Sequence, residues 1–174
     1  MPIIKIYPSK RPVRGILQYI TRGDTVPEEL IRTNGCDILD AEQEFSDIAR
    51  YYNKPTGAGN RTYYHMIVSY NTTYEKISPE EVRDMVKDLC QRTKIDCYQW
   101  YLAVHTDRPD HMHAHVVINN VSYRGDRKQH VKAGKSFQST GKLRHELMEK
   151  GNVICKEHGY EHSLVNTKSK AQER

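Results

Sequence analysis

The feature that most constrains the fold is the alternation of histidine with apolar residues in the segment His111-Met-His113-Ala-His115-Val-Val-Ile118. Side chains alternate across a β-strand, so the histidines of this segment would share one face and most of its apolar residues the other. The pattern therefore predicts a strand with one imidazole face and one face that packs against a core.

A second strand is predicted just before it, in the segment 97–107 (CYQWYLAVHTD), and the turn Asp107-Arg-Pro-Asp110 joins the two into a hairpin. If His105 lies opposite His113, three imidazoles from His105, His113 and His115 converge on one face. Neutral imidazole is a common metal ligand, and three such ligands leave coordination positions open for water or substrate. Asp107 and Asp110 could accept the second ring N–H of a ligand histidine.

Scattered histidines are usually surface or partly buried residues with ordinary hydrogen bonds. Four histidines within the eleven residues from His105 to His115, three of them in strict alternation, instead favour a functional site. His65, in the predicted strand 61–71, could face the same site, but sequence alone does not determine its orientation.

The remaining elements follow from local periodicity and capping signals. They are a strand at 1–8 ended by Pro8, a helix from Val13 that closes near Gly23, a helix from its N-cap Asp40 to Tyr52, the strand 61–71, a helix opened by the capping box Ser78-Pro-Glu-Glu81, the hairpin, and a helix between Ser136 and Gly159 that Gly151 could disturb. This order predicts an α+β fold with helices packed on an antiparallel sheet.

Length and composition set broad limits. The chain of 174 residues fits one domain, and 27 Lys and Arg against 22 Asp and Glu give a formal charge of +5. No apolar run approaches the roughly 18 residues needed to cross a bilayer, and the N-terminus does not resemble a signal peptide. The four cysteines lack a CxxC spacing, so we expect a cytoplasmic protein without disulfides.

Tyr19 is the candidate nucleophile. On the first predicted helix it lies about 110° from the centre of the apolar stripe, at the edge of the buried face. A phenol is ionised in only about one molecule in a thousand at neutral pH, so a nearby cation or base must lower the barrier to its ionisation. The sequence contains no P-loop or GxGxxG motif, and an anionic phosphate is a natural substrate for a metal held by three neutral histidines.

Three segments together resemble a known family: Arg14-Gly-Ile-Leu-Gln-Tyr19-Ile-Thr-Arg-Gly23, Tyr63-Tyr-His65, and His105-Thr-Asp-Arg-Pro-Asp-His-Met-His-Ala-His115-Val-Val-Ile-Asn119. They are similar to the relaxase domain of plasmid mobilization proteins, the MobP and VirD2 type of HUH endonuclease. The resemblance covers nearly the whole chain. It implies a central antiparallel sheet of about five strands flanked by helices, a catalytic domain over 1–162, and a polar basic tail at 163–174 that leads to a further C-terminal region.

The resemblance also implies roles for individual residues. Tyr19 matches the catalytic tyrosine, and His105, His113 and His115 match the ligands of a divalent metal, Mn or Mg first, with Zn, Co or Ni as alternatives. His111 matches a further histidine with a positioning role, and Asp110 matches its acidic neighbour.

The implied activity is cleavage of one DNA strand at the nic site of a plasmid transfer origin. The protein would stay attached to the DNA through a 5′-phosphotyrosine and later rejoin the strand. The implied partners are single-stranded and hairpin origin DNA, relaxosome accessory proteins and a type IV coupling protein, with no membrane partner.

Basic residues suggest a surface for DNA, where arginine and lysine contact phosphates. The candidates are Arg11, Arg14, Arg22, Arg124, Arg127, Lys128, Lys132 and Lys135. Tyr63, Tyr64 and Tyr123 could stack on unpaired bases. A charge of +5 is modest, so these residues support the interpretation of the hairpin without establishing it.

Two other functions remain open. The string His111-Met-His113-Ala-His115-Val-Val also resembles a histidine-triad nucleotide hydrolase or transferase, in which the middle histidine attacks a phosphate without metal; that function leaves His105 and Tyr19 unexplained. A non-catalytic DNA-binding accessory module with a structural metal is the other alternative.

Overall fold

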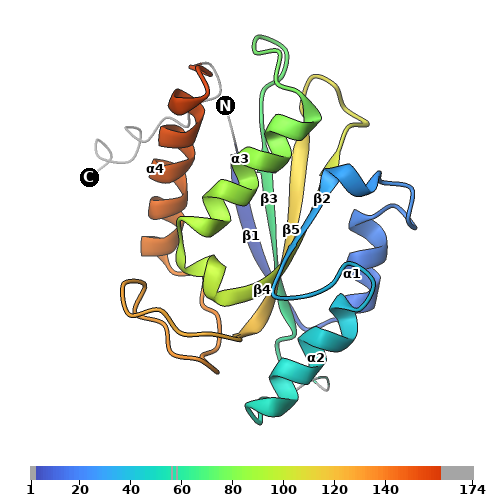
Figure 1. Ribbon diagram of the computed structural model, residues 1–174, viewed down its shortest axis with the longest axis vertical. Helices are drawn as coiled ribbons and strands as arrows, with labels where there is room; N and C mark the ends of the chain where they lie inside the picture. The colour runs from blue at the N-terminus through green and yellow to red at the C-terminus, as the bar shows by residue number, and fades with distance from the viewer. Residues whose placement is uncertain (1–2, 56, 58, 162–174) are drawn as a thin grey trace.

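A five-stranded antiparallel sheet forms the centre of the molecule in the computed structural model, which describes residues 3–55, 57 and 59–161 (Figure 1). The strands are β1 (Ile3–Ser9), β2 (Ile31–Asn34), β3 (Tyr63–Ser69), β4 (Tyr98–His105) and β5 (His113–Ser122), in the order β1-β3-β5-β4-β2. The four α-helices are α1 (Val13–Ile20), α2 (Ala41–Tyr51), α3 (Pro79–Gln91) and α4 (Gly141–Glu157), with short 3-10 turns at Glu28–Leu30 and Lys94–Cys97. The α+β class and the five-stranded antiparallel sheet are confirmed. The proposed tail at 163–174 lies outside the described residues.

Helices cover both faces of the sheet, and each face has its own apolar cluster. Trp100, Leu102 and Val104 of β4 point into the larger cluster, which also contains apolar side chains of α3 and α4. Tyr101 and Ala103 point into the smaller one, which lies under α1 and α2. In Figure 1, α4 lies at the left and α3 crosses the middle of the view, while α1 lies at the right and α2 at the lower right. The alternation along β4 therefore separates two packed layers.

Local signals explain where the helices begin and end. Ser78 Oγ accepts a hydrogen bond from the Glu81 backbone N–H (3.1 Å), and a Glu81 carboxylate oxygen accepts one from the Ser78 N–H (2.9 Å), so the predicted capping box is present. Helix α1 ends at Ile20, and the residues that follow, Arg22, Gly23 and Asp24, all adopt positive φ. This left-handed run turns the chain sharply away from the helix just after Tyr19.

Three details differ from the expectations. Strand β1 continues through Pro8, which an edge strand tolerates because one side of its backbone needs no partner. Helix α4 passes through Gly151 without interruption, and this glycine faces Ile4 of β1. Strand β2 was not predicted.

Among the described residues, no helix combines the length and apolar character needed to cross a bilayer.

Candidate metal centre

The hairpin of β4 and β5 brings the predicted ligands together. His105 lies directly opposite His113, and Ala103 lies opposite His115, which is the predicted register. One potential ligand nitrogen from each of His105, His113 and His115 lies within 4.8 Å of the others. The three rings occupy the α1 side of the sheet, at the end where α1 finishes.

His65 belongs to the same cluster. Strand β3 pairs with β5 so that His65 lies opposite Val117 and Ile67 lies opposite His115. His65 Nε2 is 2.8 Å from His115 Nδ1, so the two rings share a hydrogen bond. The orientation that sequence left open is therefore toward the histidine face.

Hydrogen bonds to the three candidate ligands indicate which nitrogen of each remains available. A backbone carbonyl can only accept, so His105 Nε2–H donates to the Ile20 carbonyl (2.8 Å) and His113 Nδ1–H donates to the His111 carbonyl (3.2 Å). His115 uses its Nδ1 toward His65. The nitrogens left for a metal are Nδ1 of His105 and Nε2 of His113 and His115.

The donor set fits a metal ion. His115 Nε2 is buried and has no hydrogen-bond partner among the described residues, which is unfavourable unless a ligand takes its lone pair. His105 Nδ1 accepts a hydrogen bond from the Arg22 guanidinium at 3.3 Å, so a metal bound to this nitrogen would replace a donor that is also positively charged. Three imidazoles on a rigid hairpin leave further coordination positions open, as in catalytic metal sites.

Burial keeps His65, His105 and His115 neutral. Desolvation, with a smaller contribution from neighbouring histidines, lowers the pKa of His115 to about 2. The same causes lower the pKa of His65 to about 4, and burial lowers the pKa of His105 below its ordinary value. A metal ligand must offer an unprotonated nitrogen, so His105 and His115 are in their ligating state at neutral pH.

Tyr19 lies against this cluster from the last turn of α1. Its ring meets His115 and His105 edge-on, with centroid distances of 5.6 and 6.0 Å, yet the residue is 51% exposed. The guanidinium carbon of Arg22 is 5.6 Å from the centroid of the Tyr19 ring, and Arg22 also forms an ion pair with Asp107 at 3.1 Å. A solvent-accessible phenol, a guanidinium and three imidazoles thus meet at one point.

His111 does not lie on the strand, contrary to the alternation argument. Strand β5 begins at His113, and residues 106–112 form a longer connection than the predicted tight turn. The reason lies in the backbone hydrogen bonds: Tyr70 N–H donates to the Met112 carbonyl and Thr72 N–H to the Asp110 carbonyl, so this segment follows the chain beyond β3.

The side chain of His111 is 57% exposed and lies 3.8 Å from Asp110. Neither Asp107 nor Asp110 accepts a ring N–H from a ligand histidine. Those N–H groups already have backbone carbonyls or His65 as partners, and Asp107 is bound to Arg22.

The basic residues are spread over the molecule. Of the candidate basic residues, only Arg22 lies at the cluster, while Arg14 of α1 forms an ion pair with Glu42 at 3.0 Å and Arg11 precedes α1. A larger group follows the opposite end of β5: Arg124, Arg127, Lys128, Lys132 and Lys135.

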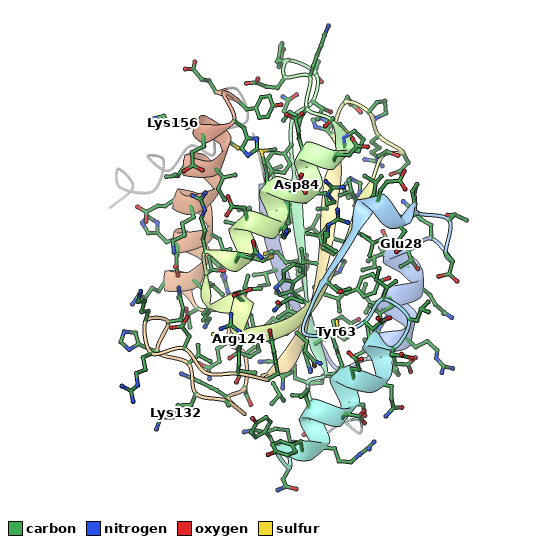
Figure 2. All side chains as sticks on the ribbon, in the orientation of Figure 1. Glu28, Tyr63, Asp84, Arg124, Lys132 and Lys156 are labelled. Atoms are coloured by element: carbon green, nitrogen blue, oxygen red, sulfur yellow. The ribbon has the colours of Figure 1, made fainter. Side chains whose placement is uncertain are left out.

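The ten residues of β5 span about 30 Å, so this second group is remote from the histidines. Figure 2 shows Arg124 and Lys132 at the lower end of the molecule. Arg124 is paired with Asp96. Tyr63 and Tyr64 are buried in the two apolar clusters, so they do not offer faces for base stacking in this conformation.

Comparisons with known proteins agree with the geometry of the site. A family model described as "Relaxase: MobA/VirD2-like, nuclease domain" matches residues 19–160. Two proteins of Staphylococcus aureus, both called protein rlx, are 29% and 26% identical to this chain over 124 residues, which is 71% of this chain and 35% and 34% of theirs. This chain thus spans about a third of the length of these relatives.

A solved structure of the conjugative relaxase TrwC, metal-bound and in complex with oriT DNA, superimposes with a TM-score of 0.51 at 11% identity, covering 93% of this chain and 74% of that one. At this identity the likeness concerns the fold. The family match, in contrast, extends from Tyr19 through the histidine hairpin to the end of α4 and includes every residue of the candidate metal centre. The chain therefore belongs to the MobA/VirD2-like relaxase nuclease domain family.

Proposed function

We propose that this domain cuts one strand of DNA at the transfer origin of a plasmid or conjugative element, with Tyr19 as the nucleophile and a divalent metal held by His105, His113 and His115. The observation that carries the proposal is the contact of the exposed Tyr19 ring with two of the three histidines. Family membership supports DNA nicking in general. The solved TrwC structure contains oriT DNA and a metal, which supports the same substrate and cofactor class for this chain.

In the proposed reaction the Tyr19 phenol loses its proton to solvent, and its oxygen attacks the scissile phosphorus. A Tyr–O–P bond forms to the 5′ phosphate while the bond from phosphorus to the 3′ oxygen breaks, and that oxygen takes up a proton to become a free 3′-OH. The phosphotyrosyl bond conserves the energy of the broken bond, so the reverse attack by a 3′-OH rejoins the strand without a nucleotide cofactor.

The residues around Tyr19 have separate tasks in this scheme. A metal bound to the three histidines supplies positive charge for the non-bridging phosphate oxygens. Arg22, held by Asp107 beside the Tyr19 ring, adds a second positive charge for the incoming phosphate. An all-imidazole donor set favours a transition metal such as Mn, Co, Ni or Zn over Mg, which prefers oxygen ligands.

The same proposal extends to partners. We expect single-stranded and hairpin DNA of the origin to bind across this face. Relaxosome accessory proteins and a type IV coupling protein would act with the whole protein in the cytoplasm. The histidine-triad alternative does not explain why Tyr19, His65 and His105 gather with the alternating histidines of β5.

The test uses a single-stranded oligonucleotide from the element's transfer origin, labelled at its 3′ end, because the covalent product retains the DNA downstream of the nick. With Mn²⁺, wild-type protein should give a labelled band that survives denaturation, and EDTA should abolish it. Tyr19→Phe should bind the oligonucleotide but form no adduct, whereas Tyr51→Phe, on the exposed side of α2, should behave as wild type.

An adduct formed by Tyr19→Phe would refute the assignment of the nucleophile. Hydrolysis of a nucleotide in the presence of EDTA, without an adduct, would instead support a histidine-triad enzyme. Binding of the oligonucleotide with neither reaction would indicate an accessory DNA-binding module.

A further inference from the structure

Each candidate ligand is held through its second ring nitrogen, but the three acceptors differ in kind. His105 and His113 donate to the backbone carbonyls of Ile20 and His111, which no side-chain substitution removes. His115, which is as deeply buried as His105, is held by the side chain of His65 instead. This contact can therefore be removed by mutation without altering the backbone.

The geometry of the pair is that of a directed hydrogen bond. His65 Nε2 and His115 Nδ1 are 2.8 Å apart, the ring centroids are 5.0 Å apart and the interplanar angle is 25°. The rings thus lie nearly coplanar and meet at their edges, which aligns the N–H of one with the lone pair of the other. His65 is fixed on β3, between β1 and β5, so the acceptor is part of the central sheet.

The direction of this hydrogen bond follows from the metal-facing nitrogen. A neutral imidazole has one N–H and one lone pair, so His115 can offer Nε2 to a metal only when its proton is on Nδ1. That proton must then be donated to His65, whose Nε2 carries the lone pair and whose own proton is on Nδ1. With the opposite tautomer, the buried Nε2 of His115 would carry the proton and could not ligate.

The geometry points to His65 as a positioning residue for the metal centre: it fixes the tautomer and ring plane of His115 and thereby sets the affinity of the site for its metal. This inference rests on the metal-binding part of the proposed function and is independent of strand cleavage. Outer partners of ligand histidines typically change metal affinity by about 10- to 100-fold.

Two substitutions separate the hydrogen bond from the volume of the side chain. His65→Phe keeps a flat ring but removes the acceptor, while His65→Gln retains a carbonyl oxygen that can accept the Nδ1–H of His115. His145→Phe is the control, because His145 is an exposed histidine on α4. Titration of the full chain with Mn²⁺ alone should show a loss of affinity of about 10- to 100-fold for His65→Phe, with His65→Gln closer to wild type and His145→Phe unchanged.

A second measurement needs neither metal nor DNA. Long-range ¹H–¹⁵N NMR of the metal-free protein distinguishes the two tautomers of each histidine. Wild type and His65→Gln should show His115 protonated at Nδ1, and His65→Phe should show a mixture of tautomers. A wild-type His115 protonated at Nε2, unchanged Mn²⁺ affinity in His65→Phe, or a wild-type protein that binds no Mn²⁺ would each overturn the inference. Normal Mn²⁺ binding that depends on His65, without DNA cleavage, would overturn the proposed function alone.

Discussion

Acidification from pH 7 to pH 5 should destabilise the metal-free domain through its buried histidines. In the folded protein, burial lowers the pKa of His65 to about 4 and that of His115 to about 2, so both remain neutral across this range. In the unfolded chain each titrates near its ordinary value of 6.5. The unfolded state therefore binds more protons than the folded state, and the free energy of unfolding falls as the pH falls.

The magnitude follows from the proton uptake of the unfolded chain. A free histidine is about 24% protonated at pH 7 and about 97% at pH 5, which corresponds to about 2 kcal/mol for each side chain that stays neutral when folded. His65 is only half-buried, so solvent screening reduces its share, and we expect about 2 to 3 kcal/mol for the pair. That loss is substantial beside a typical domain stability of about 5 to 15 kcal/mol.

The assay is urea unfolding in EDTA at pH 7, 6 and 5, followed by the fluorescence of Trp100. This residue is the only tryptophan of the chain and is buried between the sheet and the α3 and α4 layer. Carboxylates whose pKa is lowered in the folded state, such as Glu81 from its ordinary 4.5, titrate below this window. His65→Gln should reduce the pH dependence, while His145→Gln, which replaces an exposed histidine, should leave it unchanged. Equal stability at pH 7 and pH 5 would show that the cluster is not held neutral by burial.

Three other substitutions test single features. Ser78→Ala removes the cap of α3 and should cost about 1 kcal/mol in urea unfolding. Gly134→Ala should lower the melting temperature by several degrees, because Gly134 has φ +78° and an added Cβ would lie 2.5 Å from Cδ1 of Tyr52. A Gly134→Ala variant as stable as wild type would contradict this packing. Arg22→Ala should slow formation of the DNA adduct by about tenfold or more in a single-turnover assay, whereas an unchanged rate would remove Arg22 from the reaction.

Sequence predicted those parts of the fold whose signals are local. Helix α3 carries its own cap and apolar stripe, and the hairpin carries its own alternation, so both could be placed before any tertiary contact was known. Strand β2 could not, because the four residues Ile31–Asn34 are too few for a periodic pattern. They form a strand only by pairing with β4 at the edge of the sheet.

In the candidate site too, sequence predicted contacts within one hairpin but not contacts between distant segments. His105, His113 and His115 come from one hairpin, so strand parity was enough to bring them together. The Ile20 carbonyl and His65 depend on where α1 ends and on the register between β3 and β5, two contacts between distant segments that periodicity does not specify. For His111 the alternation predicted a strand position that the structure does not have. The pattern of alternating histidines includes His111, but β5 begins only at His113.

The register of β5 determines the core and the candidate metal centre together. A shift of one residue would move Ala114, Val116 and Ile118 out of the larger apolar cluster and turn His113 and His115 into it. Losing the burial of Val116 and Ile118 would cost about 1.5 to 3 kcal/mol each, and each imidazole buried without a partner would add about 1 to 3 kcal/mol. The shifted pairing is therefore strongly disfavoured. On the histidine face, Val117 is the one β5 residue in the smaller apolar cluster, whereas Ala114, Val116 and Ile118 on the opposite face pack into the larger one. Packing against α3 and α4 on that opposite face therefore contributes most of the burial that keeps His113 and His115 in register.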